Sequence, residues 1–107
     1  MDESEFASLA EKELARIEDA IEACGADVDI EPQPGGILAL SFEDDSQIII
    51  NRHLAAREIW VAARSGGFHF KPAGGDWVDT RSGEGLYALL SRVVSEQSGE
   101  AITIAPA

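Results

Sequence analysis

The sequence predicts an α+β fold, a two-layer α/β sandwich in which an N-terminal and a C-terminal helix pack on one face of a five- to six-stranded antiparallel sheet. Apolar residues recur at intervals of three and four near both ends of the chain, which indicates amphipathic helices. Between them, apolar and polar residues alternate in short segments joined by turns. Such short connections favour antiparallel pairing, because parallel strands need long crossovers. Two helices with one apolar stripe each can cover only one face of the sheet, so we expect the other face to meet solvent.

The first helix is predicted over residues 4–24, with Ser4 as its N-cap and Gly25 at its end. Glu13 projects near the apolar stripe, and we expect it at the edge of that stripe with its carboxylate reaching water. Cys24 lies on the apolar side of the helix end and is expected to be a small buried hydrophobe.

From residue 26 the period changes to two, and turn residues separate the alternating segments. Strands are therefore predicted at residues 27–31, 37–42, 47–51, 58–63, 67–70 and 76–78. The second helix follows, with Ser82 as its cap and Gly99 closing it. Residues 101–104 are expected to pack as an extended segment. The 107 residues amount to one domain, 1–107.

The chain carries a formal net charge of -12, and this charge is concentrated near the N-terminus. Residues 1–31 hold eleven acids and two bases. Such a field repels nucleic acid phosphates and anionic membranes, so neither is an expected partner, whereas cations and basic protein surfaces are attracted. The apolar runs are too short to cross a bilayer, the N-terminus is acidic, and Cys24 is the only cysteine. We therefore expect a cytoplasmic protein.

No nucleophile elbow, zinc-protease motif or phosphate-binding glycine loop occurs in the sequence, so we do not expect an enzyme. Trp60 lies on the opposite face of its strand from Ile59 and Val61, and we expect it on the solvent face, where a tryptophan is a typical interface anchor. Trp77 is expected in the core or at its rim. His53 and His69 fit surface roles better than metal ligation.

Several local strings, in this order and across nearly the whole chain, resemble the frataxin family and its small bacterial members of the CyaY type. They are Ser4-Glu5-Phe6, Ile17-Glu18-Asp19, Asp27-Val28-Asp29-Ile30-Glu31, Gly35-Gly36-Ile37-Leu38, Ile48-Ile49-Ile50-Asn51-Arg52, Ile59-Trp60-Val61-Ala62, Gly66-Gly67-Phe68-His69-Phe70, Trp77 and Arg81-Ser82-Gly83-Glu84.

This resemblance implies an iron-binding regulator, or iron chaperone, of iron–sulfur cluster assembly that docks on the cysteine desulfurase and the scaffold protein. It also implies weakly bound ferrous or ferric iron, with other divalent cations possible, and a monomer in the absence of iron. The implied iron ligands form an acidic ridge, namely Glu18, Asp19, Glu22, Asp27, Asp29 and Glu31. The implied partner-binding residues are Asn51, Glu58, Trp60 and Glu11.

The chain departs from the pattern of this family at a few positions. Ala23, Gly25 and Ala26 stand where acids are common, Glu58 where Gln is common, and Glu13 where an apolar residue is usual. Two alternative interpretations of the acids stay open: a solvated helix face beside a strand edge protected by charge, or a protein-interaction module without a metal role. An enzyme that oxidises ferrous iron is a third alternative, and it would need a more enclosed site.

Overall fold

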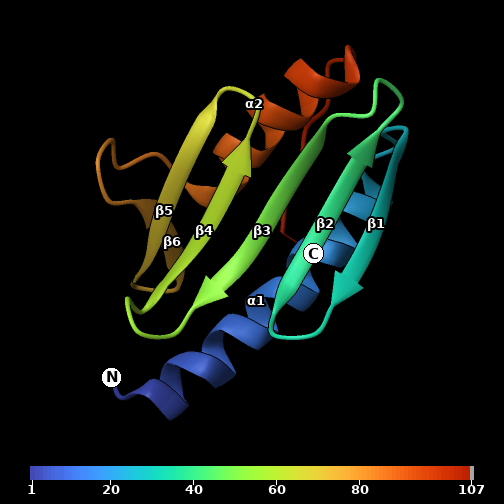
Figure 1. Cartoon of the computed structure of the whole chain (residues 1–107). Helices are drawn as coiled ribbons and strands as arrows, with labels where there is room; N and C mark the ends of the chain where they lie inside the picture. The colour runs from blue at the N-terminus through green and yellow to red at the C-terminus, as the bar shows by residue number, and fades with distance from the viewer. Residues whose placement is uncertain (107) are drawn as a thin grey trace.

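The computed structural model describes residues 1–106, which form two helices and six strands (Figure 1). Helix α1 spans Glu3–Ala23 and helix α2 spans Leu86–Ser98. The strands between them are β1 (Val28–Gln33), β2 (Ile37–Phe42), β3 (Gln47–His53), β4 (Glu58–Ala63), β5 (Gly66–Ala73) and β6 (Asp76–Asp79).

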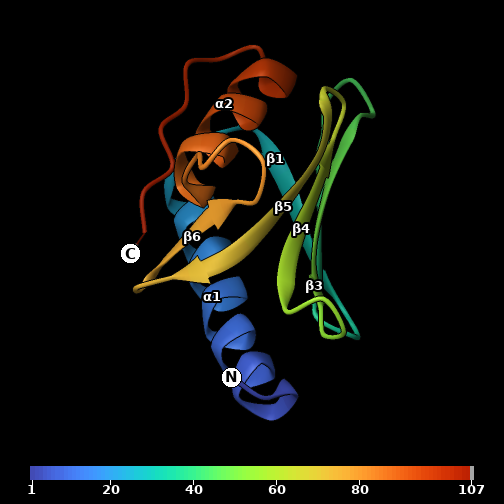
Figure 2. The same cartoon turned by 90° about the vertical axis from the view of Figure 1, so that its left-hand side faces the viewer.

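The six strands form one antiparallel sheet in the order β1-β2-β3-β4-β5-β6, so every strand pairs with its neighbours in sequence. Both helices lie on the same face of this sheet (Figure 1 and Figure 2). The predicted α+β sandwich is therefore confirmed, with six strands. We call the face that carries no helix the outer face.

Strand alternation builds the core between the sheet and the helices. The inward residues of β2, β3 and β4 are Leu38, Leu40, Phe42, Ile48, Ile50, Ile59 and Val61, all buried. The helices meet them with Phe6, Ile17, Ile21, Leu86, Leu89, Leu90, Val93 and Val94. Burial of each such side chain stabilises the fold by about 1.5–3 kcal/mol. Trp77 is also in the core, with its ring edge-on to Phe6 at 5.8 Å between centroids.

The predicted N-caps of both helices are wrong. The cap of α1 is Asp2, whose carboxylate accepts a hydrogen bond from the backbone N–H of Glu5 at 2.7 Å and which therefore starts the helix before Ser4. The cap of α2 is Gly85, because the hydroxyl of Ser82 instead donates to the buried carboxylate of Asp79 at 2.8 Å.

The predicted ends of the helices are confirmed. Gly25 follows α1 with a φ of 81°, and Gly99 caps α2 with a φ of 75°. Both lie in the left-handed region that glycine adopts without strain.

Glu13 does not reach water, which makes that prediction wrong. Its side chain is only 5% exposed and lies between the two helices. Its carboxylate accepts hydrogen bonds from the hydroxyl of Tyr87 and from the guanidinium of Arg16, the latter at 3.1 Å. A buried carboxylate is tolerated when it is hydrogen-bonded, and here α2 supplies a donor that the sequence of α1 alone does not reveal.

Cys24 is half-buried against the core, and its Sγ accepts a hydrogen bond from the backbone N–H of Ala26 at 3.5 Å, so the expectation of a buried hydrophobe holds in part. The segment after α2 packs as expected: Ile104 is buried, and its N–H donates to Ser91 Oγ at 2.8 Å. Within residues 1–106, neither helix combines the length and the apolar character needed to cross a membrane.

Candidate functional site

The acidic ridge is not a single cluster in the structure. Glu18 is half-buried on α1 and shares with Glu11 a groove of about 240 Å³ between α1 and the β1–β2 hairpin. Asp19 is exposed on the same helix. Glu22 lies near the end of α1 and lines, with Asp29 of β1, a small depression of about 280 Å³. The helix thus contributes three carboxylates at successive points along its length rather than at one point.

The acids of the first strand diverge. Asp29 and Glu31 pair in register with Ser41 and Ala39 of β2, and they project to the outer face. Glu31 accepts a hydrogen bond from the side-chain amide of Gln33 at 3.1 Å. Asp27 lies before β1 and lines a different depression, described below. Only the two acids within the strand, Asp29 and Glu31, therefore project to the same side.

The donor chemistry of the ridge suits hard cations, but its geometry does not form a cage. Carboxylate oxygens are ligands that iron, magnesium and calcium accept. Among residues 1–106, however, no group of three or more Asp, Glu, His or Cys side chains is close enough together to hold a metal ion. A cation at the ridge would have one or two protein ligands and would keep most of its water.

The ridge carboxylates also lack ion-pair partners. The ion pairs found within residues 1–106 are Glu13–Arg16, Glu11–Arg52, Asp44–Arg64, Glu58–His69 and Glu84–Arg92. None of them includes a ridge residue, so six acidic side chains face solvent or each other without a neutralising base. Their negative potential is available to a ligand or partner.

Glu11, by contrast, is already engaged. Its carboxylate accepts a hydrogen bond from Arg52 of β3 at 2.7 Å and so ties α1 to the sheet. The side chain of Arg52 runs past Gly36, where an added Cβ would come within 2.5 Å of Arg52 Cδ. Glu11 is therefore less free to meet a partner than the ridge residues are.

The predicted partner-binding residues of the outer face come together. Asn51 of β3 and Trp60 of β4 are directly opposite each other in the strand register. The indole N–H of Trp60 donates to Glu58 Oε1 at 2.8 Å. Trp60 is half-buried rather than fully exposed, because imidazole rings cover both faces of its indole: His53 at 4.0 Å and His69 at 4.4 Å between ring centroids. We call these three rings the tryptophan stack.

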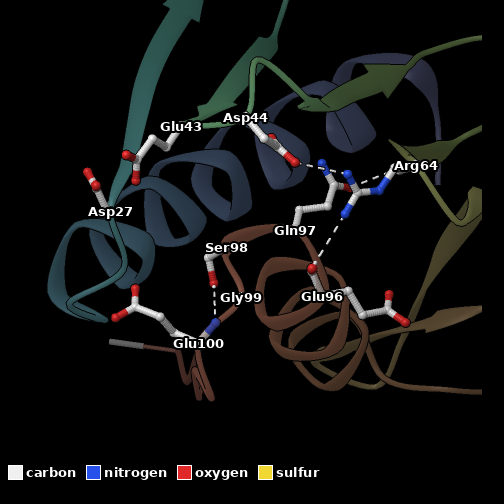
Figure 3. Close-up of a pocket in the computed structure, with 9 residues that line it drawn as sticks. All are labelled: Asp27, Glu43, Asp44, Arg64, Glu96, Gln97, Ser98, Gly99 and Glu100. Carbon is white, nitrogen blue, oxygen red and sulfur yellow. Dashed lines mark hydrogen bonds and ion pairs between the residues drawn. The ribbon is translucent and has the colours of Figure 1, made fainter.

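An open acidic depression of about 630 Å³ lies at the end of the sandwich and was not predicted from the sequence. Three acids line it from three different segments, namely Asp27, Glu43 and Glu100 (Figure 3). These residues are far apart in the chain and belong to turns and to the segment after α2, so no local pattern could have grouped them.

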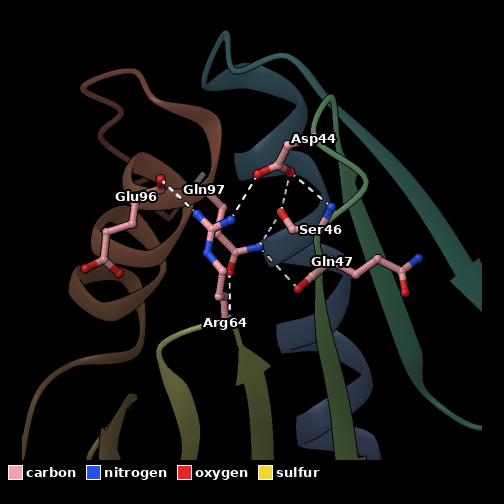
Figure 4. A network of polar contacts seen from close by, with 6 residues as sticks. All are labelled: Asp44, Ser46, Gln47, Arg64, Glu96 and Gln97. Atoms are coloured by element: carbon pink, nitrogen blue, oxygen red, sulfur yellow. Dashed lines mark hydrogen bonds and ion pairs between the residues drawn. The ribbon is translucent and has the colours of Figure 1, made fainter.

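One wall of this depression is a polar network centred on the buried Gln97 of α2 (Figure 4). The Gln97 amide accepts from the N–H of Arg64 at 3.0 Å and donates to Ser46 Oγ at 3.0 Å. Arg64 reaches Asp44 at 3.0 Å. Hydrogen bonds from Ser46, together with Arg64, lower the pKa of Asp44 to about 2. The network joins the β2–β3 and β4–β5 turns to α2 and has a structural role.

Comparisons with known proteins agree with this fold. Residues 1–100 match the family model of the Frataxin-like domain. The iron-sulfur cluster assembly protein CyaY of Dechloromonas aromatica is 57% identical over 104 residues, which cover 97% of this chain and 99% of that protein. The protein of the same name from Cupriavidus pinatubonensis is 54% identical over 107 residues, covering 97% and 96% of the two chains.

Solved structures give the same result. Frataxin from Psychromonas ingrahamii superposes with a TM-score of 0.88 at 38% identity, over 98% of this chain and 99% of that one. Trimeric frataxin from Saccharomyces cerevisiae, in complex with ferrous iron, superposes with a TM-score of 0.66 at 24% identity, over 94% and 88% of the chains, and so shares the fold.

Two helices on one face of a six-stranded antiparallel sheet, with unpaired carboxylates and a tryptophan stack on open surfaces, define a small acidic α/β sandwich protein. The chain belongs to the frataxin family. The family predicted from its local strings is thereby confirmed.

Proposed function

We propose that this protein is an iron-binding regulator, or iron chaperone, of iron–sulfur cluster assembly, and that it docks on the cysteine desulfurase and the scaffold protein. The names of its bacterial relatives support the pathway. The observation that carries the docking proposal is that none of the six ridge carboxylates is in an ion pair with a base of residues 1–106. The role is regulatory rather than catalytic, and the proposed setting is the bacterial cytoplasm.

In this proposal the ridge meets a basic patch of the desulfurase. Unpaired carboxylates attract such a patch over a Debye length of about 10 Å and speed its association. The outer-face residues Asn51, Glu58 and Trp60 engage the scaffold side. Glu11 shares a groove with the ridge residue Glu18 and contributes beside the ridge, with its carboxylate paired to Arg52.

Iron acts as cargo or signal at the ridge. With only one or two carboxylates available to each cation, ferrous or ferric iron binds weakly and other divalent cations compete. A bound cation neutralises ridge charge and so lowers the affinity for a basic partner, and by linkage the partner lowers the affinity for iron. The protein is a monomer before iron binds.

Charge reversal tests the docking step. The triple variant with Glu18, Asp19 and Glu22 changed to Lys should lose desulfurase binding, measured by calorimetry, while its circular dichroism stays native. A matched control changes three exposed acids that line no depression with a ridge residue, Glu3, Asp45 and Asp76, to Lys, which alters the net charge equally. Equal binding by the two triple variants would overturn the docking proposal.

A second experiment tests the iron role. An anaerobic titration of the labelled protein with ferrous iron in moderate salt should broaden amide signals within residues 18–31, and magnesium in large excess over iron should be needed to restore them. Full restoration by an equimolar amount of magnesium, or no broadening by iron, would overturn a specific role for iron.

The second candidate function is an acidic protein-interaction module without a physiological metal role. The absence of any group of three potential metal ligands within residues 1–106 favours it. It predicts partner binding that weakens with salt but does not respond to iron, so the two titrations together distinguish the candidates.

A further inference from the structure

The tryptophan stack includes a contact between a histidine, His69, and a carboxylate, Glu58, that has no role in the proposed function. His69 Nδ1 lies 3.6 Å from Glu58 Oε1, the same oxygen that accepts the indole N–H of Trp60 at 2.8 Å. Histidine is the side chain whose charge ordinarily changes between about pH 5 and 8. A proton on His69 therefore converts this contact into an ion pair that shares the Glu58 oxygen with the indole.

The two imidazoles of the stack are not equivalent. His53 Nδ1 accepts a hydrogen bond from the backbone N–H of Ala56 at 3.2 Å, so its Nδ1 carries no proton and a second proton would break a contact of the β3–β4 loop. His69 has a carboxylate beside the corresponding nitrogen instead. A second proton thus meets a carboxylate at His69, whereas at His53 it would cost the hydrogen bond from Ala56.

The other charged groups around the stack come from three elements. Glu58 is the acid of β4, and Lys71 lies two residues beyond His69 on the same face of β5. Arg57 is in the β3–β4 loop, where its guanidinium donates to the carbonyl of Leu54 at 2.8 Å. The acids Asp29 and Glu31 share the outer face but belong to β1, three strands away from β4. Glu58 is thus the nearest acid, and a charge on His69 neutralises it.

We propose that His69 is a proton-controlled clamp on Trp60. When His69 is neutral, Glu58 is an anionic acceptor held only by the indole, and the outer face around Trp60 presents one free negative charge. When His69 is protonated, its cation lies over the indole face and against Glu58, which tightens the stack and cancels that charge. A partner that approaches this face with basic residues then binds less well. This last consequence rests on the proposed function, whereas the clamp itself does not.

The clamp is tested on the isolated protein. Trp60 and Trp77 are the only tryptophans, so their two indole N–H signals are distinguishable by NMR once a Trp60→Phe variant has assigned them. Between pH 8 and pH 5 the Trp60 signal should move along a single titration curve and the buried Trp77 signal should stay still. His69→Gln should abolish that movement, and the matched control His53→Gln should keep it. A Trp60 signal that moves equally in His69→Gln, or not at all in the parent protein, would overturn the clamp.

The docking consequence is tested by measuring affinity for the desulfurase–scaffold complex at pH 8 and pH 6. The parent protein should lose about threefold more affinity on acidification than His69→Gln, which retains any pH dependence of the partner itself. If the parent protein and His69→Gln lost the same affinity on acidification, control of docking by His69 would be overturned. Absence of binding at both pH values, with the indole titration intact, would overturn the proposed function and leave the clamp standing.

Discussion

The hydroxyl of Tyr87 on α2 donates a hydrogen bond to the carboxylate of Glu13 on α1, and this contact joins two residues 74 positions apart in the chain. Both groups are removed from water: Glu13 is buried and Tyr87 is half-buried. Burial, reinforced by the neighbouring Glu13 carboxylate, raises the pKa of Tyr87. The pair holds the two helices together at a position where the core carries a charge.

Removal of the hydroxyl should destabilise the protein. Tyr87→Phe deprives the buried Glu13 carboxylate of one donor, and we expect the free energy of unfolding to fall by about 1–3 kcal/mol in urea denaturation at neutral pH. Changing Glu13 to Gln in the Tyr87→Phe background should recover part of the lost stability. A buried neutral amide that lacks one hydrogen-bond partner destabilises the fold less than a buried carboxylate that lacks one. An unchanged midpoint in Tyr87→Phe would contradict a stabilising role for the contact.

The same pair predicts a loss of stability in alkali. Because folding raises the pKa of Tyr87, the contribution of the protonated hydroxyl is complete below the usual value of 10.0 and is lost as the pH rises above it. Tyr87 is the only tyrosine, so tyrosinate absorbance reports it alone and should appear at higher pH in the native than in the urea-unfolded protein. Coincident titration curves would rule the prediction out.

Alanine substitution should have different effects on stability at the two glycines of the turn between β1 and β2. Gly35 and Gly36 both have left-handed backbone conformations, with φ of 90° and 77°. Space is open beside Gly35, whereas a Cβ on Gly36 would collide with the side chain of Arg52. Alanine at Gly35 should cost about 1–2 kcal/mol through strain alone. Alanine at Gly36 should cost more, because Arg52 must also move and its pair with Glu11 is disturbed. Thermal unfolding of both variants measures the difference, and equal costs would show that Arg52 moves aside freely.

The contacts of Asp44 should stabilise the protein at neutral pH but not in acid. Its pKa is lowered from 3.8 to about 2, so its stabilising contacts with Ser46 and Arg64 are complete above the usual value and are lost as the pH falls through about 2. Asp44→Asn should therefore melt below the parent protein at neutral pH, and the gap should close between about pH 4 and pH 2. Asp45→Asn, which changes the adjacent exposed acid, is the control and should show no such closing gap.

The unpaired ridge predicts that cations stabilise the fold. Like-charge repulsion among ridge carboxylates is screened by salt, so the melting temperature should rise with sodium chloride and, at much lower concentration, with magnesium. A variant with Glu18, Glu22 and Asp29 changed to the corresponding amides should respond less. A melting temperature indifferent to both additions would contradict the repulsion that an unpaired ridge implies.

Much of the fold is determined locally and was predictable from the chain. The alternation of apolar residues identified the strands, as Glu58–Ala63 illustrates, and the helical spacing identified both helices. Helix ends at Gly25 and Gly99 followed from their conformational freedom. The caps were predicted wrongly because several candidate side chains stand near each helix start, and the choice depends on which one finds a free backbone N–H in three dimensions. Asp2 does so for α1, whereas the hydroxyl of Ser82 accepts from the N–H of Glu84, which lies before the first residue of α2, Leu86.

The sequence by itself therefore determined the element order, the charge and the family, since these depend on residue type and spacing along the chain. The tertiary structure alone decided how side chains far apart in sequence meet. It placed Tyr87 on Glu13, imidazoles of two strands against Trp60, and the ridge acids apart from one another rather than in one cluster. The physical reason is that side-chain contacts depend on strand register and helix packing, whereas sequence periodicity determines only the face on which a residue lies.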